Sequence, residues 1–404
     1  MRNLVMLGAA LVLASCGGAS TSGSGGPTPT PTPTVTPTPT PAVPITGVTQ
    51  SAAIAVFERP WAIKAMPDGR FLVTQRNAAG ALSIVATSGA VTPVSGLPTT
   101  IGLLDDKLAS DFQSSRTIYF SAMVRDTAAP RVGRGAADAT LFPERMTVFS
   151  ARLTESGGTA QLTGVTEIFR QVPTIVTFAG SGEPGGRIAI APDGMLLITS
   201  GDRQELDRTF LFAMDNTIGK VVRIRPDGSV PLDNPFVGVA GARPEIWTIG
   251  HRNPYGLAFA PSGLLWSSEH GPLGGDEFNL ITRGSNYGWP AVSNGDNYDS
   301  SPIPDHAPGD GFAAPAVNWS PVIAPAGMIF YAGNRFADWR GDAILTGLSS
   351  QALVRVRING TGAAEVQRIA MGARIRDIAE MPDGSLYILT DGAAGELRRV
   401  DPVF

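Results

Sequence analysis

The chain has 404 residues, of which 43% are hydrophobic and 16% are charged, so it has enough apolar side chains for a large core. This composition excludes global disorder, and a formal net charge of -4 argues against a nucleic-acid partner, which would require a basic face. Cys16 is the single cysteine, so no intrachain disulfide can form.

The N-terminal segment is predicted to be a targeting signal rather than part of the fold. Residues 1–15 contain Arg2 followed by an apolar run that is too short for a transmembrane helix, which is typical of a secretory signal. The stretch Leu13-Ala14-Ser15-Cys16 resembles a bacterial lipobox, which implies cleavage before Cys16 and lipidation of its thiol. An ordinary signal peptide with an incidental cysteine is the alternative. Since Gly17 is not an acidic retention signal, we expect an outer-membrane anchor facing the periplasm of a Gram-negative cell.

Residues 16–47 are predicted to be a tether. They are rich in Gly and Ser and then in Pro and Thr, as in "PTPTPTPTVTPTPTP". Alternating proline favours an extended polyproline II conformation and cannot form a core. The globular part is therefore predicted to occupy residues 48–404.

The globular part reads as all-β. Short runs of Val, Ile, Leu, Phe and Thr alternate with Pro-Asp-Gly and Gly turns, and no long segment has a helical period. One unit, a turn followed by an apolar strand, recurs at 66–74, 191–199, 260–268 and 381–389.

The spacing of these units indicates a repeat. The gaps from Pro67 to Pro192, to Pro261 and to Pro382 fit two, one and two repeats of roughly 60–70 residues, which makes six turn-and-strand positions. We predict a six-bladed β-propeller with four-stranded antiparallel blades. A large β-sandwich or two β-domains is the alternative.

Polar residues gather in Gly250-His251-Arg252-Asn253-Pro254, between two strand-like runs. In a propeller, such strand ends would face a shared central funnel, where ligands bind. By itself the same stretch is more typical of a structural turn, with Asn and Pro in their usual places.

Four neighbouring segments give the polar stretch a context. In chain order between Gly219 and Pro290 they read "GKVVRIRPDGSVPLDNPF", "PEIWTIGHRNPYGLAF", "SSEHGPLGGDEFNLI" and "GSNYGWP". Together they resemble the soluble glucose/sorbosone dehydrogenase family, which includes aldose sugar dehydrogenases that use pyrroloquinoline quinone (PQQ). The similarity extends over most of residues 55–400. It implies a six-bladed propeller that holds PQQ over a calcium ion in the funnel.

The resemblance implies roles for two pairs of residues toward PQQ. Arg252 and Asn253 match the pair beside the quinone carbonyls, where a guanidinium stabilises developing negative charge. Arg374 and Arg376 match the pair that binds the carboxylates of the cofactor, and alternate strand positions share one face. The alternative for the second pair is solvated surface charge.

The resemblance also implies metal ligands and a substrate contact. Gly271 and Pro272 match residues whose backbone carbonyls bind calcium, which would act as a Lewis acid. Glu277 and Tyr287 match a second, structural calcium site. Trp319 is a candidate wall for a sugar face, with an ordinary core tryptophan as the alternative.

The sequence departs from the family at the general base. The family has a histidine shortly before "GGR", whereas Glu183 occupies that place here, and Asp202 corresponds to the acid that orients the base. A carboxylate is a weaker base than imidazole near neutral pH unless its surroundings raise its basicity. Thr100 and Ser349 stand where the family has a glutamine and a lysine that contact the cofactor.

Three functions follow from these residues. The first is a lipid-anchored PQQ- and calcium-dependent enzyme that oxidises the C1 hydroxyl of aldoses to lactones and passes the electrons to an acceptor. The second is a non-catalytic propeller of the same family that binds a sugar or a protein. The third is a calcium-dependent lactonase-like hydrolase, for which the sequence offers no ligand set.

Overall fold

The computed structural model describes residues 43–77, 79–177, 182–204 and 208–404. The predicted signal peptide, Cys16 and nearly all of the predicted tether lie outside the described residues. Apart from α1 (Phe112–Ser115), α2 (Arg208–Phe212) and the 3-10 turn η1 (Ala337–Trp339), the regular structure of the described part is β-strand. No helix in these ranges combines the length and the apolar character that a membrane crossing requires.

The N-terminal strands form one sheet of eight strands in the order β3-β4-β5-β6-β10-β9-β8-β7. Neighbouring strands are antiparallel except β6 and β10, which pair in parallel at Val94 with Ala160. Two antiparallel runs of four strands are thus joined at their outer edges. The strands are β3 (Pro60–Ala65), β4 (Phe71–Gln75), β5 (Ala81–Val85), β6 (Val91–Ser95), β7 (Leu103–Leu108), β8 (Thr117–Arg125), β9 (Glu144–Ser156) and β10 (Thr159–Arg170).

Three antiparallel sheets of four strands follow, in the orders β11-β12-β13-β14, β15-β16-β18-β20 and β21-β22-β23-β24. A two-stranded ladder of β17 (Leu273–Gly274) and β19 (Gly295–Asp296) stands beside them. The sheet strands are β11 (Gly185–Ile190), β12 (Leu196–Ser200), β13 (Lys220–Ile224), β14 (Ile246–Ile249), β15 (Asn253–Phe259), β16 (Leu265–His270), β18 (Asp276–Leu280), β20 (Val317–Trp319), β21 (Pro325–Phe330), β22 (Ala343–Gly347), β23 (Ala352–Asn359) and β24 (Gly362–Ala370).

The last sheet joins the two ends of the folded region. Its strands β25 (Ile375–Glu380), β26 (Leu386–Thr390) and β27 (Gly395–Val403) pair in order, and β1 (Gly47–Gln50) completes the outer edge with Gly47 opposite Val403. The short strand β2 (Ala55–Phe57) also pairs with β27. The N-terminal strand therefore closes the sheet that the C-terminal strands begin.

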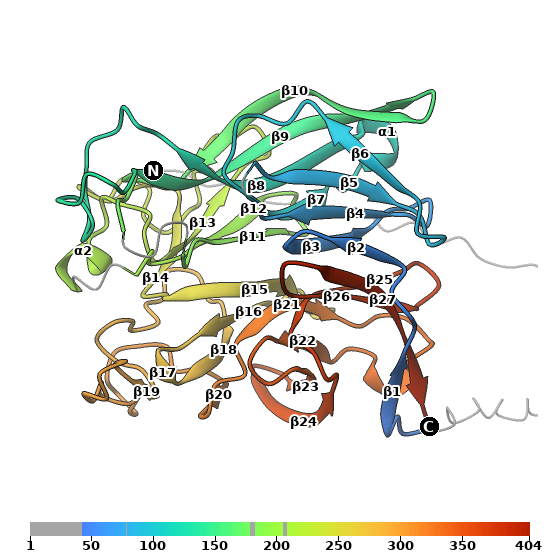
Figure 1. The fold of residues 1–404 in the computed structure, drawn as a ribbon. Helices are drawn as coiled ribbons and strands as arrows, with labels where there is room; N and C mark the ends of the chain where they lie inside the picture. The colour runs from blue at the N-terminus through green and yellow to red at the C-terminus, as the bar shows by residue number, and fades with distance from the viewer. Residues whose placement is uncertain (1–42, 78, 178–181, 205–207) are drawn as a thin grey trace, which may run out of the picture. The chain divides into compact units, whose positions relative to one another are not determined.

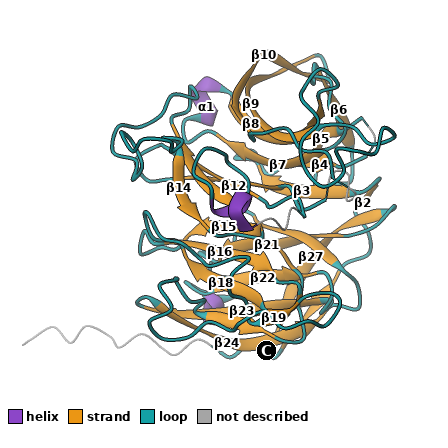
Figure 2. Cartoon of the chain, turned by 90° about the vertical axis from the view of Figure 1, so that its left-hand side faces the viewer, coloured by secondary structure: helices purple, strands orange, loops and turns teal. Residues whose placement is uncertain are grey.

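The first strands of the successive runs contact one another in a closed ring, from β3 through β7, β11, β15, β21 and β25 back to β3. Figure 1 shows first strands side by side through the middle of the domain, with later strands of each sheet outside them. Figure 2, turned by 90°, shows the sheets ranged around this centre. The fold is a β-propeller, as the sequence predicted.

Central strands are buried on both faces because each sheet is packed between two others. On one face of the β11–β14 sheet, Ile188 and Ile198 pack with Met146 of β9. On the other, Leu197 and Val221 pack with Leu257 of β15. Burial on both faces explains why these strands read as continuous apolar runs rather than as alternating ones.

The four predicted turn-and-strand units join first strands to second strands, at β3–β4, β11–β12, β15–β16 and β25–β26. Their turn glycines, at 69, 194, 263 and 384, have φ between +79° and +84°, a region that glycine adopts without steric cost. The corresponding β7–β8 and β21–β22 connections contain α1 and η1 instead. The prediction of these four units is confirmed.

Candidate active site

Two cavities lie where the first strands begin. One, of about 500 Å³, is lined by Glu183, which precedes β11, and by Arg252, which precedes β15, together with Pro272, Trp289 and Tyr298. The other, of about 640 Å³, is lined by residues at the starts of β3, β7 and β25, namely Pro60, Trp61, Ile101 and Arg376, and by Arg59 and Asp391. Polar residues at these strand starts therefore face open space.

A register shift occurs near the start of every one of these first strands, for example between Gly185 and Ile188 in β11 and between Pro254 and Gly256 in β15. A β-bulge re-aims side chains next to it. The repeated bulges thus set the direction of the side chains at the cavity end of the ring.

Glu183 and Arg252 form an ion pair in the first cavity. Nη2 of Arg252 lies 2.6 Å from Oε1 of Glu183, and the two side chains are 6% and 11% exposed. The second carboxylate oxygen of Glu183, Oε2, is buried without a hydrogen-bond partner among the described residues, and so is Nε of Arg252. Because an unpaired buried polar atom is costly, these two atoms mark a place where a polar ligand fits.

Asp202 lies next to this ion pair and is fully buried. Its Oδ2 accepts a hydrogen bond from Nε1 of Trp289 at 2.8 Å, and its Oδ1 accepts one from the backbone N–H of Gln204 at 2.8 Å. Burial, and then the negative charge of Glu183, raise the pKa of Asp202 well above its ordinary value. Asp202 therefore keeps its proton at pH values where an exposed aspartate has lost it, which leaves the negative charge of the pair on Glu183.

The guanidinium of Arg252 is fixed from several sides. Its Nη1 donates to the carbonyl oxygen of Gly271 at 2.9 Å and its Nη2 donates to the hydroxyl of Tyr298 at 3.0 Å. The rings of Trp289 and Tyr298 lie 5.4 and 5.7 Å from it. Burial alone would lower the pKa of Arg252, but the charge of Glu183 raises it above its ordinary value. The residue is a permanent, preorganised cation.

Asn253 and His270 tie the Glu183 loop to the neighbouring sheets. Burial, and then the charge of Arg252, lower the pKa of His270 to about 4, so its ring is neutral. Its Nε2 donates to the carbonyl of Pro325 at 2.7 Å, and its Nδ1 accepts from Nδ2 of Asn253 at 3.2 Å. Oδ1 of Asn253 then accepts from the N–H of Gly185 at 3.3 Å. Asn253 therefore positions the loop that carries Glu183.

Arg374 and Arg376 share one partner, Asp391, which lines the second cavity. Nε of Arg374 and Nε of Arg376 each lie 2.9 Å from a carboxylate oxygen of Asp391. Burial would raise the pKa of Asp391, but the two guanidiniums hold it below its ordinary value. Both arginines thus face the same acid, and Arg376 also lines the cavity.

Gly271 and Pro272, two of the predicted calcium ligands, lie beside Arg252 and the first cavity. The carbonyl of Gly271 accepts from Arg252, and Pro272 lines the first cavity. A Cβ at position 271 would lie 2.2 Å from the carbonyl oxygen of Gly274, so only glycine fits there. Within the described ranges, no group of three or more His, Cys, Asp or Glu side chains has the spacing to hold a metal ion.

Three other predicted residues lie outside the two cavities. Glu277 accepts from Nδ2 of Asn279 at 2.9 Å and lies 3.6 Å from Nε2 of His306, while the hydroxyl of Tyr287 bonds to the backbone at Leu280 and Thr282. Trp319 is 6% exposed in the core between sheets, and its Nε1 donates to Glu365 at 2.7 Å. The structure does not bring Trp319 together with Glu183 and Arg252.

The sequence reasoning assigned no role to His270, Trp289 or Tyr298. His270 and Trp289 fall in the segments "SSEHGPLGGDEFNLI" and "GSNYGWP", which resemble the family without indicating a role for either side chain. Tyr298 lies in a Gly/Asn/Asp/Ser-rich loop that shows no motif. Thr100 donates to the carbonyl of Ala79 at 2.8 Å, next to Ile101 of the second cavity, and Ser349 bonds through its backbone to Ile323.

Comparison with known proteins gives one family. The Glucose / Sorbosone dehydrogenase family model matches residues 57–399. The chain is 36% identical over 359 residues to the aldose sugar dehydrogenase YliI of Escherichia coli (strain K12), with 85% of this chain and 90% of that protein covered. It is 27% identical over 426 residues to quinoprotein glucose dehydrogenase B of Acinetobacter calcoaceticus, with 85% of each covered.

Solved structures agree with this result. The soluble aldose sugar dehydrogenase of Escherichia coli in its apo-form superposes with a TM-score of 0.78 at 33% identity, covering 88% of this chain and 100% of that one. The PQQ-bound aldose sugar dehydrogenase of Streptomyces coelicolor superposes with a TM-score of 0.68 at 26% identity, covering 90% and 100%. Since the family model spans most of the chain and a relative with 36% identity covers 85% of it, the chain belongs to the glucose/sorbosone dehydrogenase family.

Proposed function

We propose that the protein oxidises the C1 hydroxyl of aldose sugars to lactones with PQQ and calcium, on a propeller of six four-stranded blades. The observation that carries the proposal is the buried Glu183–Arg252 ion pair, which lines a cavity and keeps one oxygen and one nitrogen unpaired among the described residues. The relatives named above, an aldose sugar dehydrogenase and a quinoprotein glucose dehydrogenase, support this chemistry.

The residues at the strand starts fit a planar, anionic quinone. Arg252 supplies a fixed cation at the first cavity and Arg376 supplies one at the second, where Arg374 binds the same acid, Asp391. The pKa of His270 responds to the charges of Arg252, Glu183 and Arg376, so these groups surround one region. Trp61 and Tyr255, in edge contact at 5.6 Å, add apolar rings to it. When bound, PQQ supplies an ortho-quinone that accepts the hydrogen of C1 with its electron pair.

The residues of the first cavity would then have separate roles in the oxidation of the sugar. Glu183, which lines the cavity, takes the proton of the C1 hydroxyl at a carboxylate oxygen. Asp202, which retains its own proton, keeps the neighbouring carboxylate oriented as base. Arg252, held by Gly271 and Tyr298, stabilises the negative charge that develops on oxygen.

Calcium is proposed at the backbone carbonyls of Gly271 and Pro272, which are hard oxygen donors of the type that calcium prefers. The carbonyl of Gly271 already accepts from Arg252, so an ion bound there shares or replaces that hydrogen bond. A second, structural site is proposed at Glu277 and Tyr287, where an ion would have to displace the partners that both side chains now hold.

The location of the protein is a separate proposal. We infer a signal peptide at 1–15, a lipidated Cys16 with a tether to residue 47, and an outer-membrane anchor that presents the domain of residues 48–404 to the periplasm. Cys16→Ser should release the protein from the membrane fraction of the native host. If this variant still sediments with membranes, the lipid anchor is wrong.

Reconstitution tests the catalytic proposal. The purified protein is mixed with PQQ, with calcium or a chelator, then separated from free quinone and examined by absorption spectroscopy and by dye-linked oxidation of an aldose panel. We expect retained quinone and aldose oxidation with calcium, and loss of both with the chelator. Retained quinone without oxidation of any aldose would instead support a binding protein that kept the scaffold.

A further inference from the structure

Arg59 adopts a backbone conformation that an arginine rarely adopts. It stands immediately before β3 with φ of +48°. Its N–H donates to the carbonyl of Gly392 at 3.2 Å, and its own carbonyl accepts from the N–H of Arg76 at 2.8 Å. A left-handed conformation costs a residue with a Cβ roughly 1–2 kcal/mol, and such strain concentrates at functional sites. The segment after β4 and the connection between β26 and β27 thus hold Arg59 in place at a local cost.

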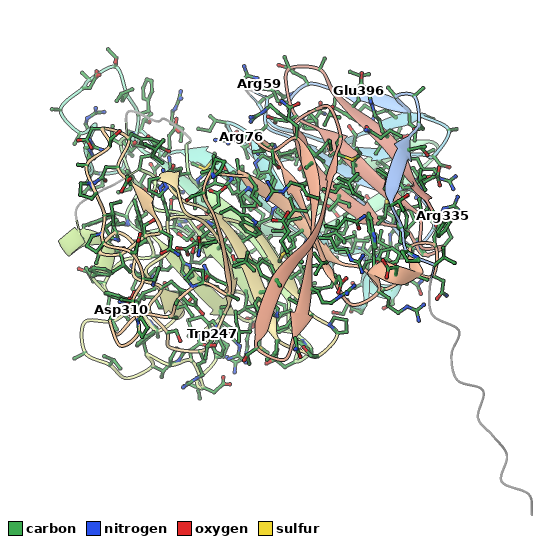
Figure 3. The ribbon with its side chains drawn as sticks, turned by 90° about the horizontal axis from the view of Figure 1, so that it is seen from below. Arg59, Arg76, Trp247, Asp310, Arg335 and Glu396 are labelled. Atoms are coloured by element: carbon green, nitrogen blue, oxygen red, sulfur yellow. The ribbon has the colours of Figure 1, made fainter. Side chains whose placement is uncertain are left out.

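The side chain of Arg59 is exposed and has neither a hydrogen bond nor an ion pair in the described part of the chain. It nevertheless lines the cavity of about 640 Å³ together with Arg76 and Arg376. Figure 3 shows Arg59 and Arg76 near each other at one edge of the domain. A strained backbone therefore presents an unpaired guanidinium to the cavity that Arg376, one of the two predicted carboxylate-binding residues, also lines.

The charge of that predicted pair is partly neutralised. Arg374 and Arg376 both bind Asp391, so the three side chains together carry one net positive charge. PQQ carries three carboxylates on its rings, which one net charge matches poorly. Glu58 and Arg76 also line the cavity, and their opposite charges cancel, so the net charge stays at one. A further cation at this cavity is therefore needed to balance the cofactor, and Arg59 can supply it.

We propose that Arg59 is a third carboxylate-binding residue for the quinone, beside Arg374 and Arg376. This inference rests on the proposed function. Guanidinium is suited to the role because it is always charged and its planar fork of donors matches a carboxylate. The position before β3 brings it to the same cavity as Arg376 from a different sheet.

The test compares quinone affinity among variants of the full chain, by fluorescence titration with PQQ in the presence of calcium. Arg59→Asn removes the charge and keeps a residue that tolerates the left-handed backbone, and Arg59→Gly removes both charge and strain. Both should weaken quinone binding on the order of tenfold, as the loss of a charge-assisted contact predicts. Arg59→Lys should lose less quinone affinity than Arg59→Asn or Arg59→Gly, because lysine keeps the positive charge. Arg152→Gln, which removes an exposed arginine of β9, is the matched control and should bind as the wild type does.

A second ligand separates carboxylate binding from a change in cavity shape. With the trimethyl ester of PQQ, wild type and Arg59→Asn should bind equally, since the ester offers no carboxylate. A persistent difference with the ester, or unchanged affinity of Arg59→Asn and Arg59→Gly for PQQ, overturns the role of Arg59 and leaves the proposed function standing. If the wild type binds no PQQ, both proposals fall. Melting temperatures at or above that of the wild type should show that the variants fold.

Discussion

Two buried polar clusters occupy successive depths of the same ring of first strands. The entrance cluster consists of Glu183, Arg252 and Asp202 at the strand starts. The axial cluster lies further along the strands and consists of Arg187 in β11, Asp105, Asp106 and Lys107 in β7, Lys64 in β3 and Asp377 in β25. In the axial cluster, Nη1 of Arg187 lies 3.1 Å from Asp105 and its Nη2 lies 3.3 Å from Asp377.

The two clusters differ in what their polar atoms contact. Asp105 also accepts from the N–H of Ile188 and Asp377 accepts from the N–H of Ile63, both at 2.9 Å, so the acids of the axial cluster bind the backbones of neighbouring sheets. Arg187 further donates to the carbonyl of Tyr255 at 2.6 Å and lies 4.1 Å from the ring of Trp61. Arg187, Asp105 and Asp377 of the axial cluster therefore join sheets, although both carboxyl oxygens of Asp106 have no hydrogen-bond partner in the described ranges. Burial, charge and unpaired polar atoms occur in both clusters, and what distinguishes the entrance cluster is the cavity that it lines.

The largest expected effect is on stability, at the centre of the axial cluster. Arg187→Leu leaves Asp377 buried without its ion-pair partner and Asp105 with Lys107 alone, at 3.5 Å, and we expect the free energy of unfolding to fall by about 3–5 kcal/mol. Urea denaturation measures it. Arg335→Leu, which breaks the exposed pair with Asp401, is the control and should change stability by about 1 kcal/mol or less. Equal effects of both variants would show that the axial cluster does not hold the ring.

Substitutions in the entrance cluster should instead change the rate of aldose oxidation. Glu183→Gln should lower dye-linked aldose oxidation by roughly a hundredfold or more while quinone binding stays nearly intact, because only the base is lost. Glu183→His should hold or raise the rate near neutral pH, where imidazole titrates. Unchanged activity of Glu183→Gln would place the base elsewhere. A wild type that is inactive until it carries Glu183→His would favour the binding-protein function.

Substitutions in the proposed carboxylate-binding pair and its partner acid should change the affinity for PQQ. Replacing Arg374 and Arg376 together by Gln should weaken PQQ binding about tenfold or more, since a charge-assisted pair contributes about 1.5–3 kcal/mol. Asp391→Asn keeps both arginines and removes their shared acid, so it should bind PQQ at least as tightly as the wild type. Titration with and without a chelator measures both variants. Equal PQQ affinity with and without calcium would contradict the calcium-dependent site.

The smallest effect is a pH-dependent one, at Asp106. Burial, and then the charge of Asp105, raise its pKa to about 7, against the opposing charges of Lys64 and Lys107. The folded state therefore holds a proton that the unfolded chain releases between about pH 4 and 7, so the stability contributed by Asp106 falls as pH rises through this window. Asp106→Asn removes that penalty. Its melting temperature should exceed that of the wild type by about 2 °C or more at pH 8 and match it near pH 4.

The substitution Asp106→Asn should break no hydrogen bond. Both carboxyl oxygens of Asp106 are buried without a hydrogen-bond partner in the described ranges, so the amide replaces no contact. A melting temperature of Asp106→Asn below that of the wild type at pH 8 would show that the carboxylate is needed to balance Lys64 and Lys107.

The local elements of the domain could be predicted from short stretches of the sequence. The turns at Pro67-Asp68-Gly69 and its three counterparts depend on residues that set φ within a few positions of one another, and all four join the expected strands. The family-like segments also single out Arg252, Arg374 and Asp202 as candidate site residues. These predictions are possible because turn chemistry and short motifs are contained in contiguous residues.

Which of those residues lie together depends on the packing of the sheets. Glu183 and Arg252 are 69 positions apart, and their ion pair exists because the first strands β11 and β15 pack side by side in the ring. The same packing placed Trp319 in the core between sheets and made Asn253 a support for the Glu183 loop. It also brought Arg59 to the same cavity as Arg376. Contacts between sheets depend on how the whole ring closes, and closure is a property of all the sheets together that no single stretch of sequence contains.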